Sequence, residues 1–307
     1  MSLFTTVLSA VLLSTTIPLQ EEGGQSQAVQ TQEPAVLGDV EITGQRLQQQ
    51  VQSFIHDATA APRGRNLARW DRSICMGVAN FDARYAQFMI DRVAKVATEI
   101  GLSIDEPGCK PDIMVVAAAD ASALARALVA DDPRGFRPAR NLTDLGSAAL
   151  ERFQSTDAPV RWWHVSLPVS VDTGDIAVRL DGEEAQQIAV RDPSRIRSNV
   201  RDDLARVVVI IDVTKVGRIG FGALSDYIAM VALAQIEPDA DTSTFNSVLN
   251  LFSDQSDRNT GLTQWDMDYL KSLYTARRDR ARATQQGRDI VQGMTGERDT
   301  RLREEDQ

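Results

Sequence analysis

Residues 203–236 constrain the fold more strongly than any other part of this 307-residue chain. They begin with a β-branched run, Val207–Val213, that is apolar on both faces apart from Asp212. A glycine-spaced link follows, and then an alanine-rich segment upstream of Pro238. A strand that is apolar on both faces belongs in the interior of a sheet. The stretch therefore predicts a central strand followed directly by a core helix.

The predicted core helix carries no side-chain set with recognisable chemistry. Ser225 is a suitable N-cap residue, and Asp226 would then lie in the first turn, where its charge complements the helix dipole. Tyr227, Ile228 and Val231 follow at helical spacing and form an apolar side. We expect this helix to pack against the sheet rather than to present catalytic groups.

The flanking sequence predicts an α+β fold. Residues 82–100 have the apolar spacing of an amphipathic helix, and Gly101 provides its stop. Three more strands are predicted, at residues 73–78, 113–118 and 160–167. Thr263 is the predicted cap of another amphipathic helix. Together these elements predict one α+β domain over residues 38–282, with a mixed β-sheet, flanking helices and a helical C-terminal part.

Both ends of the chain differ in composition from the predicted domain. Residues 1–20 contain an apolar stretch typical of a signal peptide, although the first basic residue is Arg46, and a cytosolic leader is the alternative. Residues 21–37 have the composition of a flexible linker, and residues 283–307 that of a charged flexible tail. The sequence thus predicts a periplasmic or secreted protein with no stable membrane span once the signal segment is removed.

A short segment near the start of the predicted domain has a strand-like pattern. Val40 and Ile42 alternate with polar residues, which favours a short edge strand of the domain. The segment Glu41–Arg46 also resembles the E-I-V-V-T-G-x-R segment of TonB-dependent receptors, where an extended chain pairs with the edge strand of another protein. That resemblance implies docking on an envelope protein.

Two cysteines, Cys75 and Cys109, each lie beside a predicted strand and are separated by one predicted helix. In an exported protein, such a pair is expected to form a disulfide, which would stabilise the fold by about 3–4 kcal/mol. Two free buried thiols are the alternative if the protein is not exported. A catalytic thiol ranks third, because neither histidine is close to a cysteine in the sequence.

Charge and composition exclude several kinds of function. The chain has 33 Lys and Arg against 43 Asp and Glu, a formal net charge of -10, which argues against nucleic acid as a partner. It has only two cysteines and two histidines, His56 and His164, which limits any metal site. Neither a G-x-S-x-G nor a Walker pattern occurs. We expect no metal and no organic cofactor.

The predicted strand Val160–Leu167 is a candidate binding surface. Its alternation places Trp162, His164 and Ser166 on one face and Trp163 on the other. We expect one tryptophan to belong to the core. The other, beside His164, would line a groove or a stacking surface.

The sequence pattern L-T-x-x-D-x-x-x-L-x-x-L-Y, which begins at Leu262, resembles the C-terminal half of metzincin-type zinc peptidases. In that family a strand leads to a helix bearing H-E-x-x-H-x-x-G-x-x-H, a tight turn around a methionine follows, and a helix then opens with Leu-Thr. The resemblance sets Ser247–Leu249 at the methionine turn. The three metal-ligand positions, the general base and the glycine fall on Asp226, Met230, Ile236, Tyr227 and Leu233. It implies a zincin-like scaffold without its metal.

A second resemblance covers the whole chain. The V/I-T-G-Q-R start, the paired cysteines, the W-H-V strand, the D-Y-x-A-M helix and the L-T-x-W-D helix are similar to those of a group of predicted exported proteins from alphaproteobacteria. This similarity implies export and no particular activity.

The sequence favours an exported, non-catalytic binding or structural module on a degenerate zincin-like scaffold, with an envelope protein or a peptide as its partner. The candidate ligand or partner surface consists of Trp162, His164, Ser166, Asp226, Tyr227 and Met230. A metal-independent hydrolase is the alternative, and it would be built on Ser166, His164 and Asp226. That alternative requires the three side chains to meet within hydrogen-bond reach.

Overall fold

The computed structural model describes residues 36–139, 142–184, 187, 188, 190, 196–253 and 260–305. The predicted signal-peptide segment and nearly all of the predicted linker lie outside these residues. Within the described part, no helix is long and apolar enough to cross a membrane.

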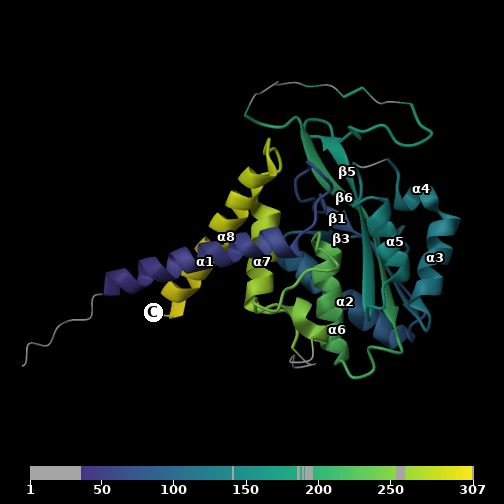
Figure 1. Cartoon of the computed structure of the whole chain (residues 1–307), viewed down its shortest axis with the longest axis horizontal. Coiled ribbons are helices and arrows are strands. Elements are labelled where there is room, and N and C mark those ends of the chain that lie inside the picture. Colours follow the sequence, from purple (N-terminus) through teal and green to yellow (C-terminus); the bar gives the residue numbers. More distant parts are fainter. Residues whose placement is uncertain are drawn as a thin grey trace, which may run out of the picture.

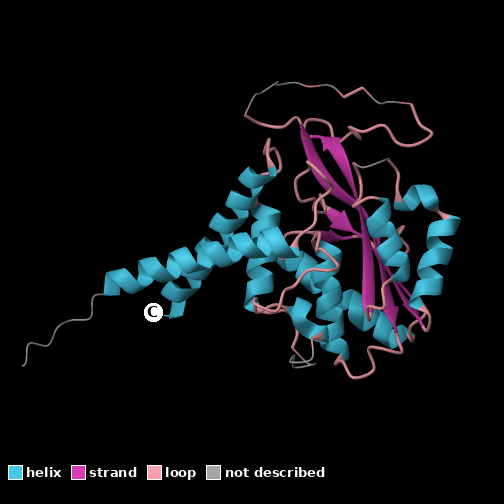
Figure 2. Cartoon of the chain, viewed as in Figure 1, coloured by secondary structure: helices cyan, strands magenta, loops and turns pink. Residues whose placement is uncertain are grey.

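A mixed four-stranded sheet forms the centre of the fold (Figure 2). Its strand order is β2-β4-β6-β5. Its strands are β2 (Met76–Ala79), β4 (Ile113–Ala118), β6 (Val200–Asp212) and β5 (Val160–Ser170). The first three run parallel, and β5 pairs antiparallel with β6 at the edge. A separate parallel pair joins β1 (Ser73–Ile74) to β3 (Ser103–Ile104). As the sequence predicts, the run Val207–Val213 contributes a central strand, because β6 lies between β4 and β5.

Helices cover both faces of this sheet (Figure 1). On one face lie α2 (Ala83–Glu99) and α6 (Phe221–Leu233), and on the other lie α3 (Ala121–Asp131), α4 (Pro133–Phe136) and α5 (Ser147–Ser155). The larger apolar cluster fills the α6 face, and a smaller one fills the α3 and α5 face. The predicted α+β class is therefore confirmed, with two cores separated by one sheet.

A group of helices extends away from the sheet and forms the helical C-terminal part (Figure 1). It contains α1 (Val36–Ala58), α7 (Gln264–Thr275) and α8 (Ala283–Glu305), while the 3₁₀-helix η1 (Val248–Phe252) lies against α6. The start of α7 is a capping box, in which Thr263 and Asp266 each accept a hydrogen bond from the other's backbone N–H. The predicted cap at Thr263 is confirmed.

Residues 283–305 differ from the flexible tail that their composition predicts, because they form α8. Three apolar residues, Ile290, Val291 and Met294, are buried in the larger core. The side chain of Gln286 is also buried and bonds both the N–H and the C=O of Leu67. The segment has few apolar residues, but their helical spacing places them on one side of α8. That side is sufficient to hold the helix against the core.

The strand predicted around Val40 and Ile42 is instead part of α1. The second half of α1 is fixed by Leu47, Val51 and Phe54, which are buried in the core. Once that half is packed, the helix extends toward its N-terminus, because each added residue gains a backbone hydrogen bond without a new nucleation step. The segment Glu41–Arg46 is therefore helical and does not offer a strand for pairing with another protein.

Helix α6 begins earlier than the sequence predicts. Its N-cap is Gly220, and Ser225 lies inside the helix, where its hydroxyl donates to the carbonyl of Phe221 at 2.8 Å. Asp226 consequently lies in the second turn rather than the first. The glycine-spaced link that suggested a loop is compatible with a helix start, because a buried helix is held by packing more than by propensity.

Candidate functional site

The buried C-terminal end of α6 lies at the centre of the candidate site. The last carbonyls of a helix lack partners within the helix and need donors from elsewhere. Three side chains supply them here. His164 Nε2 donates to the carbonyl of Val231 at 2.7 Å, Trp70 Nε1 to that of Ala232 at 2.9 Å, and the Tyr274 hydroxyl to that of Leu233 at 2.8 Å. These three donors come from β5, from the segment before β1 and from α7. The end of α6 therefore connects three parts of the fold through hydrogen bonds.

His164 acts in this structure as a helix cap. Its ring is buried, and burial lowers its pKa from 6.5 to about 4, with the hydrogen bond to Val231 opposing that shift. A carbonyl oxygen can only accept, so Nε2 carries the proton and the ring is neutral near pH 7. That nitrogen is therefore not free to take a proton from a nucleophile.

Asp226 links three elements instead of joining His164. Its carboxylate accepts two hydrogen bonds from Arg92 of α2, at 2.5 and 2.7 Å, and one from the N–H of Leu262 at 3.0 Å. The hydrogen bond to Asp226 raises the pKa of Arg92. A Cβ on Gly261 would lie 2.0 Å from Asp226 Oδ2, so only glycine fits beside this carboxylate. Asp226 is thus the buried partner of a half-exposed ion pair, and its bond to Leu262 fixes the approach to α7.

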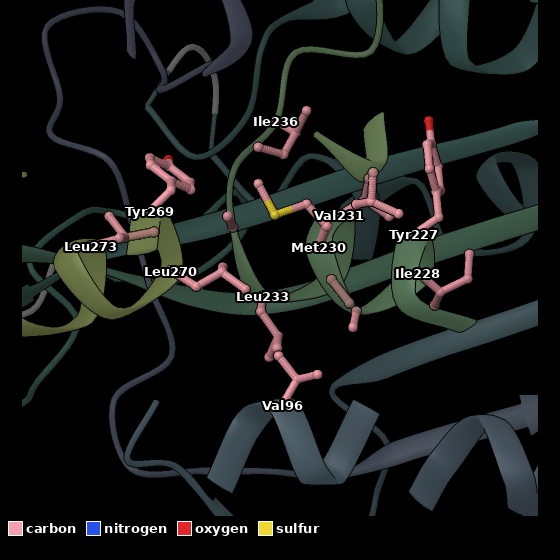
Figure 3. Packing of buried hydrophobic residues seen from close by; sticks show 14 of the residues in the cluster. Val96, Tyr227, Ile228, Met230, Val231, Leu233, Ile236, Tyr269, Leu270 and Leu273 are labelled. Atoms are coloured by element: carbon pink, nitrogen blue, oxygen red, sulfur yellow. The ribbon is translucent and has the colours of Figure 1, made fainter. Parts of the chain in front are cut away.

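The positions that the metzincin comparison assigned to metal chemistry are in the apolar core. Tyr227, Met230, Leu233 and Ile236 are all at most 6 % exposed. Figure 3 shows Met230, Leu233 and Ile236 gathered in one cluster with side chains of α7. Burial raises the pKa of the Tyr227 hydroxyl well above its usual value, so it stays protonated. Among the described residues, no group of three or more His, Cys, Asp or Glu could hold a metal ion.

The residues proposed for a metal-independent hydrolase do not form a catalytic set. His164 is bound to Val231 and Asp226 to Arg92, while the N–H of Ser166 donates to Thr143 at 2.8 Å. Within the part of the chain that the structure describes, no hydrogen bond joins His164, Ser166 and Asp226 to one another. The fold brings His164 to α6 but directs Asp226 toward α2.

The two tryptophans of β5 lie on opposite faces of the sheet, as the alternation predicts. Trp162 packs on the α6 side, with its ring 6.0 Å from that of Tyr227, and its Nε1 donates to the carbonyl of Ile236 at 3.0 Å. Trp163 packs on the α5 side and donates to the carbonyl of Phe136 at 2.8 Å. Both rings are buried, so neither forms an exposed stacking surface.

The predicted disulfide between Cys75 and Cys109 is confirmed. It ties the residue between β1 and β2 to the loop that precedes β4. No described cysteine is free.

The outer edge of β5 carries unpaired backbone groups. In an antiparallel pair, every second residue directs its N–H and C=O away from the neighbouring strand. The carbonyl of Pro159 accepts from Asp212 at 2.9 Å, which sets Val160, Trp162 and His164 as the outward residues. Among the described residues, no backbone group binds these outward N–H and C=O groups.

A narrow hollow of about 60 Å³ runs beside this edge. Residues 160–164 of β5 form its floor, α5 forms one side, and Pro238 and Asp239 form the other. Arg152 of α5 spans the hollow with ion pairs to Asp239 at 3.0 Å and to Glu237 at 3.9 Å. A volume of this size holds a few water molecules but no peptide. The Arg152 ion pairs cross this hollow, so an incoming strand would have to displace them.

Arg161 is the unusual charged group at this hollow. It is only 3 % exposed, yet it forms no ion pair with a described carboxylate. Its guanidinium instead donates to Ser122 at 3.0 Å and to the carbonyls of Phe153 and Thr156 at the end of α5, at 3.1 and 2.5 Å. Burial lowers its pKa. Its Nε has no partner, whereas the partly buried guanidinium of Arg65 meets the carboxylate of Asp202.

Comparison of the chain with protein-family models, with curated proteins and with solved structures returns no match.

Sequence reasoning identified His164 and Trp162 but missed Arg152 and Arg161. An arginine in an otherwise apolar strand, V-R-W-W-H-V, was the available signal for Arg161. The local sequence around Arg152 does not predict its ion pair, since its partner Asp239 is brought close only by the fold.

Proposed function

We propose that this protein is an exported, non-catalytic binding module whose β5 edge takes up an extended segment of a partner protein. The segment would add to the sheet as a further strand and would carry a carboxylate for Arg161. The scaffold, in this proposal, is a degenerate zincin-like one. The observation that carries the proposal is the free backbone edge at residues 160–164, next to a buried guanidinium that has no carboxylate.

Strand addition explains the backbone geometry of this edge. A row of unpaired N–H and C=O groups is a template for another chain, and natural proteins usually cover it or interrupt it with charge. Extended peptides bind such edges through main-chain hydrogen bonds, and side-chain pockets supply the specificity. Val160, Trp162 and His164 would each offer one N–H and one C=O to the incoming strand.

Arg161 favours an acidic ligand. A buried guanidinium with no carboxylate in contact is costly. The carbonyls at the end of α5 and the charges of Asp212, Asp120 and Asp157, which lie beyond ion-pair distance, offset only part of that cost. A carboxylate that accepts from Arg161 Nε would add a charge-assisted bond, which is stronger than a neutral one. The ligand is therefore expected to present a C-terminal carboxylate or an acidic side chain beside Arg161.

The order of elements supports the zincin-like scaffold. β6 leads directly into α6, and α6 ends at Leu233, the position that corresponds to the glycine of the peptidase motif. η1 begins at Val248, inside the segment assigned to the methionine turn, and the N–H of Val248 donates to Asp266 at 2.8 Å. Because apolar or ion-paired residues occupy the metal positions, binding without hydrolysis is the activity that this scaffold supports best.

Export is supported by the disulfide. Such bonds persist in oxidising compartments such as the bacterial periplasm and the extracellular space, and are rare in the cytosol. A periplasmic or secreted location would bring the β5 edge into contact with segments of envelope proteins or with peptides.

The experiment compares two labelled heptapeptides of alternating Val and Thr, one with a free C-terminal carboxylate and one amidated. We expect the carboxylate peptide to bind about tenfold more tightly, because a charge-assisted hydrogen bond contributes about 1.5 kcal/mol. Arg161→Gln should remove this preference, while Arg134→Gln, which alters an arginine outside the hollow, should keep it. Equal affinity of the two peptides for the unaltered protein would contradict the role of Arg161. Failure of both peptides to bind would contradict the whole proposal.

A further inference from the structure

The sheet has a second free edge at β2, next to the disulfide. β2 has β4 on one side only. The carbonyl of Cys75 accepts from the N–H of Ile113 at 3.0 Å, and this parallel register turns the backbone groups of Gly77 toward β4. The N–H and C=O groups of Met76 and Val78 point outward as a result. Within the described chain, neither residue has a backbone partner on that side.

The fold leaves this position empty for a specific reason. β3 pairs with β1 and stops at Ile104, and the N–H of Asp105 still bonds the carbonyl of Ile74 at 3.0 Å. The chain then turns through Pro107 toward Cys109, where the disulfide holds it. β3 therefore ends just before it would reach the outward groups of β2. A strand that continued along the path of β3 would meet them.

A hollow of about 520 Å³ lies beside the edge of β2. α2 forms one wall with Gln87, Ile90 and Asp91, and the disulfide loop forms the other. A volume in this range is typical of sites that bury a small ligand. It is large enough to admit a few residues of an extended chain without any rearrangement of α2.

The charge of the hollow is of one sign. Its charged lining residues are Asp91 and Asp105, and neither forms a described ion pair. Asp91 accepts one neutral hydrogen bond, from Gln87 at 2.7 Å, and both residues are exposed. The remaining lining residues are mostly apolar. A ligand that complements this surface has an apolar part and a positive charge.

We propose that the hollow holds a short extended segment of a partner protein, which pairs with the outward groups of Met76 and Val78 and carries a basic side chain that reaches Asp91 and Asp105. This site is separate from the β5 edge. It selects the opposite charge, and it stands whether or not the β5 edge binds a ligand.

The test uses a labelled hexapeptide of alternating Val and Thr with one central Arg, blocked at both ends, and a matched peptide with Gln in place of Arg. The Arg peptide is expected to bind, and Asp91→Asn should weaken it about two- to fivefold, as expected for an exposed ion pair. Glu99→Gln, which alters a carboxylate of α2 outside the hollow, should leave its affinity unchanged. The Gln peptide should bind the unaltered protein at least as weakly as the Arg peptide binds the Asp91→Asn variant, because Asp105 still attracts the Arg peptide in that variant.

Amide exchange locates the bound peptide. Binding should slow exchange at Met76 and Val78 but leave Gly77, which already bonds β4, unchanged. Val78→Pro removes an N–H that no described residue uses, and this variant should lose the peptide. If the proline variant does not fold, the exchange pattern and the affinity of the Asp91→Asn variant decide whether the peptide binds at β2. Equal binding of the Arg and Gln peptides, absence of binding at millimolar peptide, or protection confined to other residues would overturn the proposal.

Discussion

The two edges of the sheet offer the same backbone chemistry but differ in access. At β5, the outward residues are buried, and an Arg152 bridge closes a hollow of about 60 Å³. At β2, all four strand residues are partly exposed and border a hollow of about 520 Å³. The charges differ as well, because Arg161 lies at the first edge and Asp91 and Asp105 at the second. The side chains around a free strand edge can thus determine its accessibility and the charge of the ligand that fits it.

The two edges would bind their ligands in different ways. The β2 edge is open and should bind rapidly, with its affinity limited by a few hydrogen bonds and exposed charges. At the β5 edge, a ligand must first break the ion pairs of Arg152, which costs binding free energy. A carboxylate on the ligand then becomes a partner for the buried Arg161 and offsets this cost. Variants that change one edge at a time can use the other edge as the reference.

The largest effect is expected from removal of the disulfide. Replacing Cys75 and Cys109 together by serine should lower the free energy of unfolding by about 3–4 kcal/mol, because the unfolded chain loses a long closed loop. Peptide binding at β2 should weaken, since the disulfide loop forms a wall of that hollow, while binding at β5 stays unchanged. Denaturant unfolding and both peptide assays measure this. Reductant added to the unaltered protein should give the same loss, and equal sensitivity of the two edges would contradict the assignment of the loop to β2.

The next effect concerns the pH dependence of stability at the β5 side. The unfolded chain protonates His164 below about pH 6.5, but the folded chain does so only below about pH 4. The stabilising contribution is therefore complete above the unfolded pKa and is lost as the pH falls toward 4. The loss amounts to about 3 kcal/mol over this window. His164→Gln can still donate to Val231 but does not titrate, so its stability should fall less between pH 7 and pH 4.

A matched control is provided by His56, the other histidine. Its side chain is 87 % exposed, lies on α1 and lines neither of the two hollows. His56→Gln leaves the buried His164 in place, so the loss of stability between pH 7 and pH 4 that His164 causes should persist in this variant when denaturant midpoints are compared. If His56→Gln rather than His164→Gln flattens the profile, His164 is not the buried cap that this geometry describes.

The smallest effect on stability is expected from opening the β5 hollow. Arg152→Ala removes an ion pair whose two side chains are more than half exposed, so the cost should stay below about 1 kcal/mol. Affinity for the carboxylate peptide should rise, because the ligand no longer has to break the bridge, and binding at β2 should not change. Fluorescence titration with both peptides measures this. A decrease in carboxylate-peptide affinity would mean that Arg152 is a ligand-binding group rather than a closure.

Much of the fold could be predicted from local patterns. The apolar run of β6, the cap at Thr263 and the alternation of β5 are each decided by neighbours in the sequence, and all three predictions were confirmed. The disulfide followed from two cysteines beside predicted strands. The tail and the strand near Val40 were predicted incorrectly, because α1 and α8 depend on packing in a helical group whose partners are distant in the sequence.

The candidate site was less predictable because its residues have roles set by tertiary contacts. The alternation of β5 placed His164 and Trp162 on one face but could not show that His164 caps α6. Asp226 was expected near the dipole of α6, whereas its charge is used by Arg92, which the sequence places far upstream. The hollows at β5 and β2 depend on which strands lie at the sheet edges, and that order cannot be read from periodicity.

The most direct test of the central claim is residue-resolved amide exchange of the protein saturated with the carboxylate heptapeptide. Strand addition should give an alternating pattern in β5, with slower exchange at Val160, Trp162 and His164 and no change at Arg161 and Trp163, whose N–H groups already face β6. Uniform protection of the strand, or protection that is absent from these three amides while the peptide is bound, would contradict strand addition at β5.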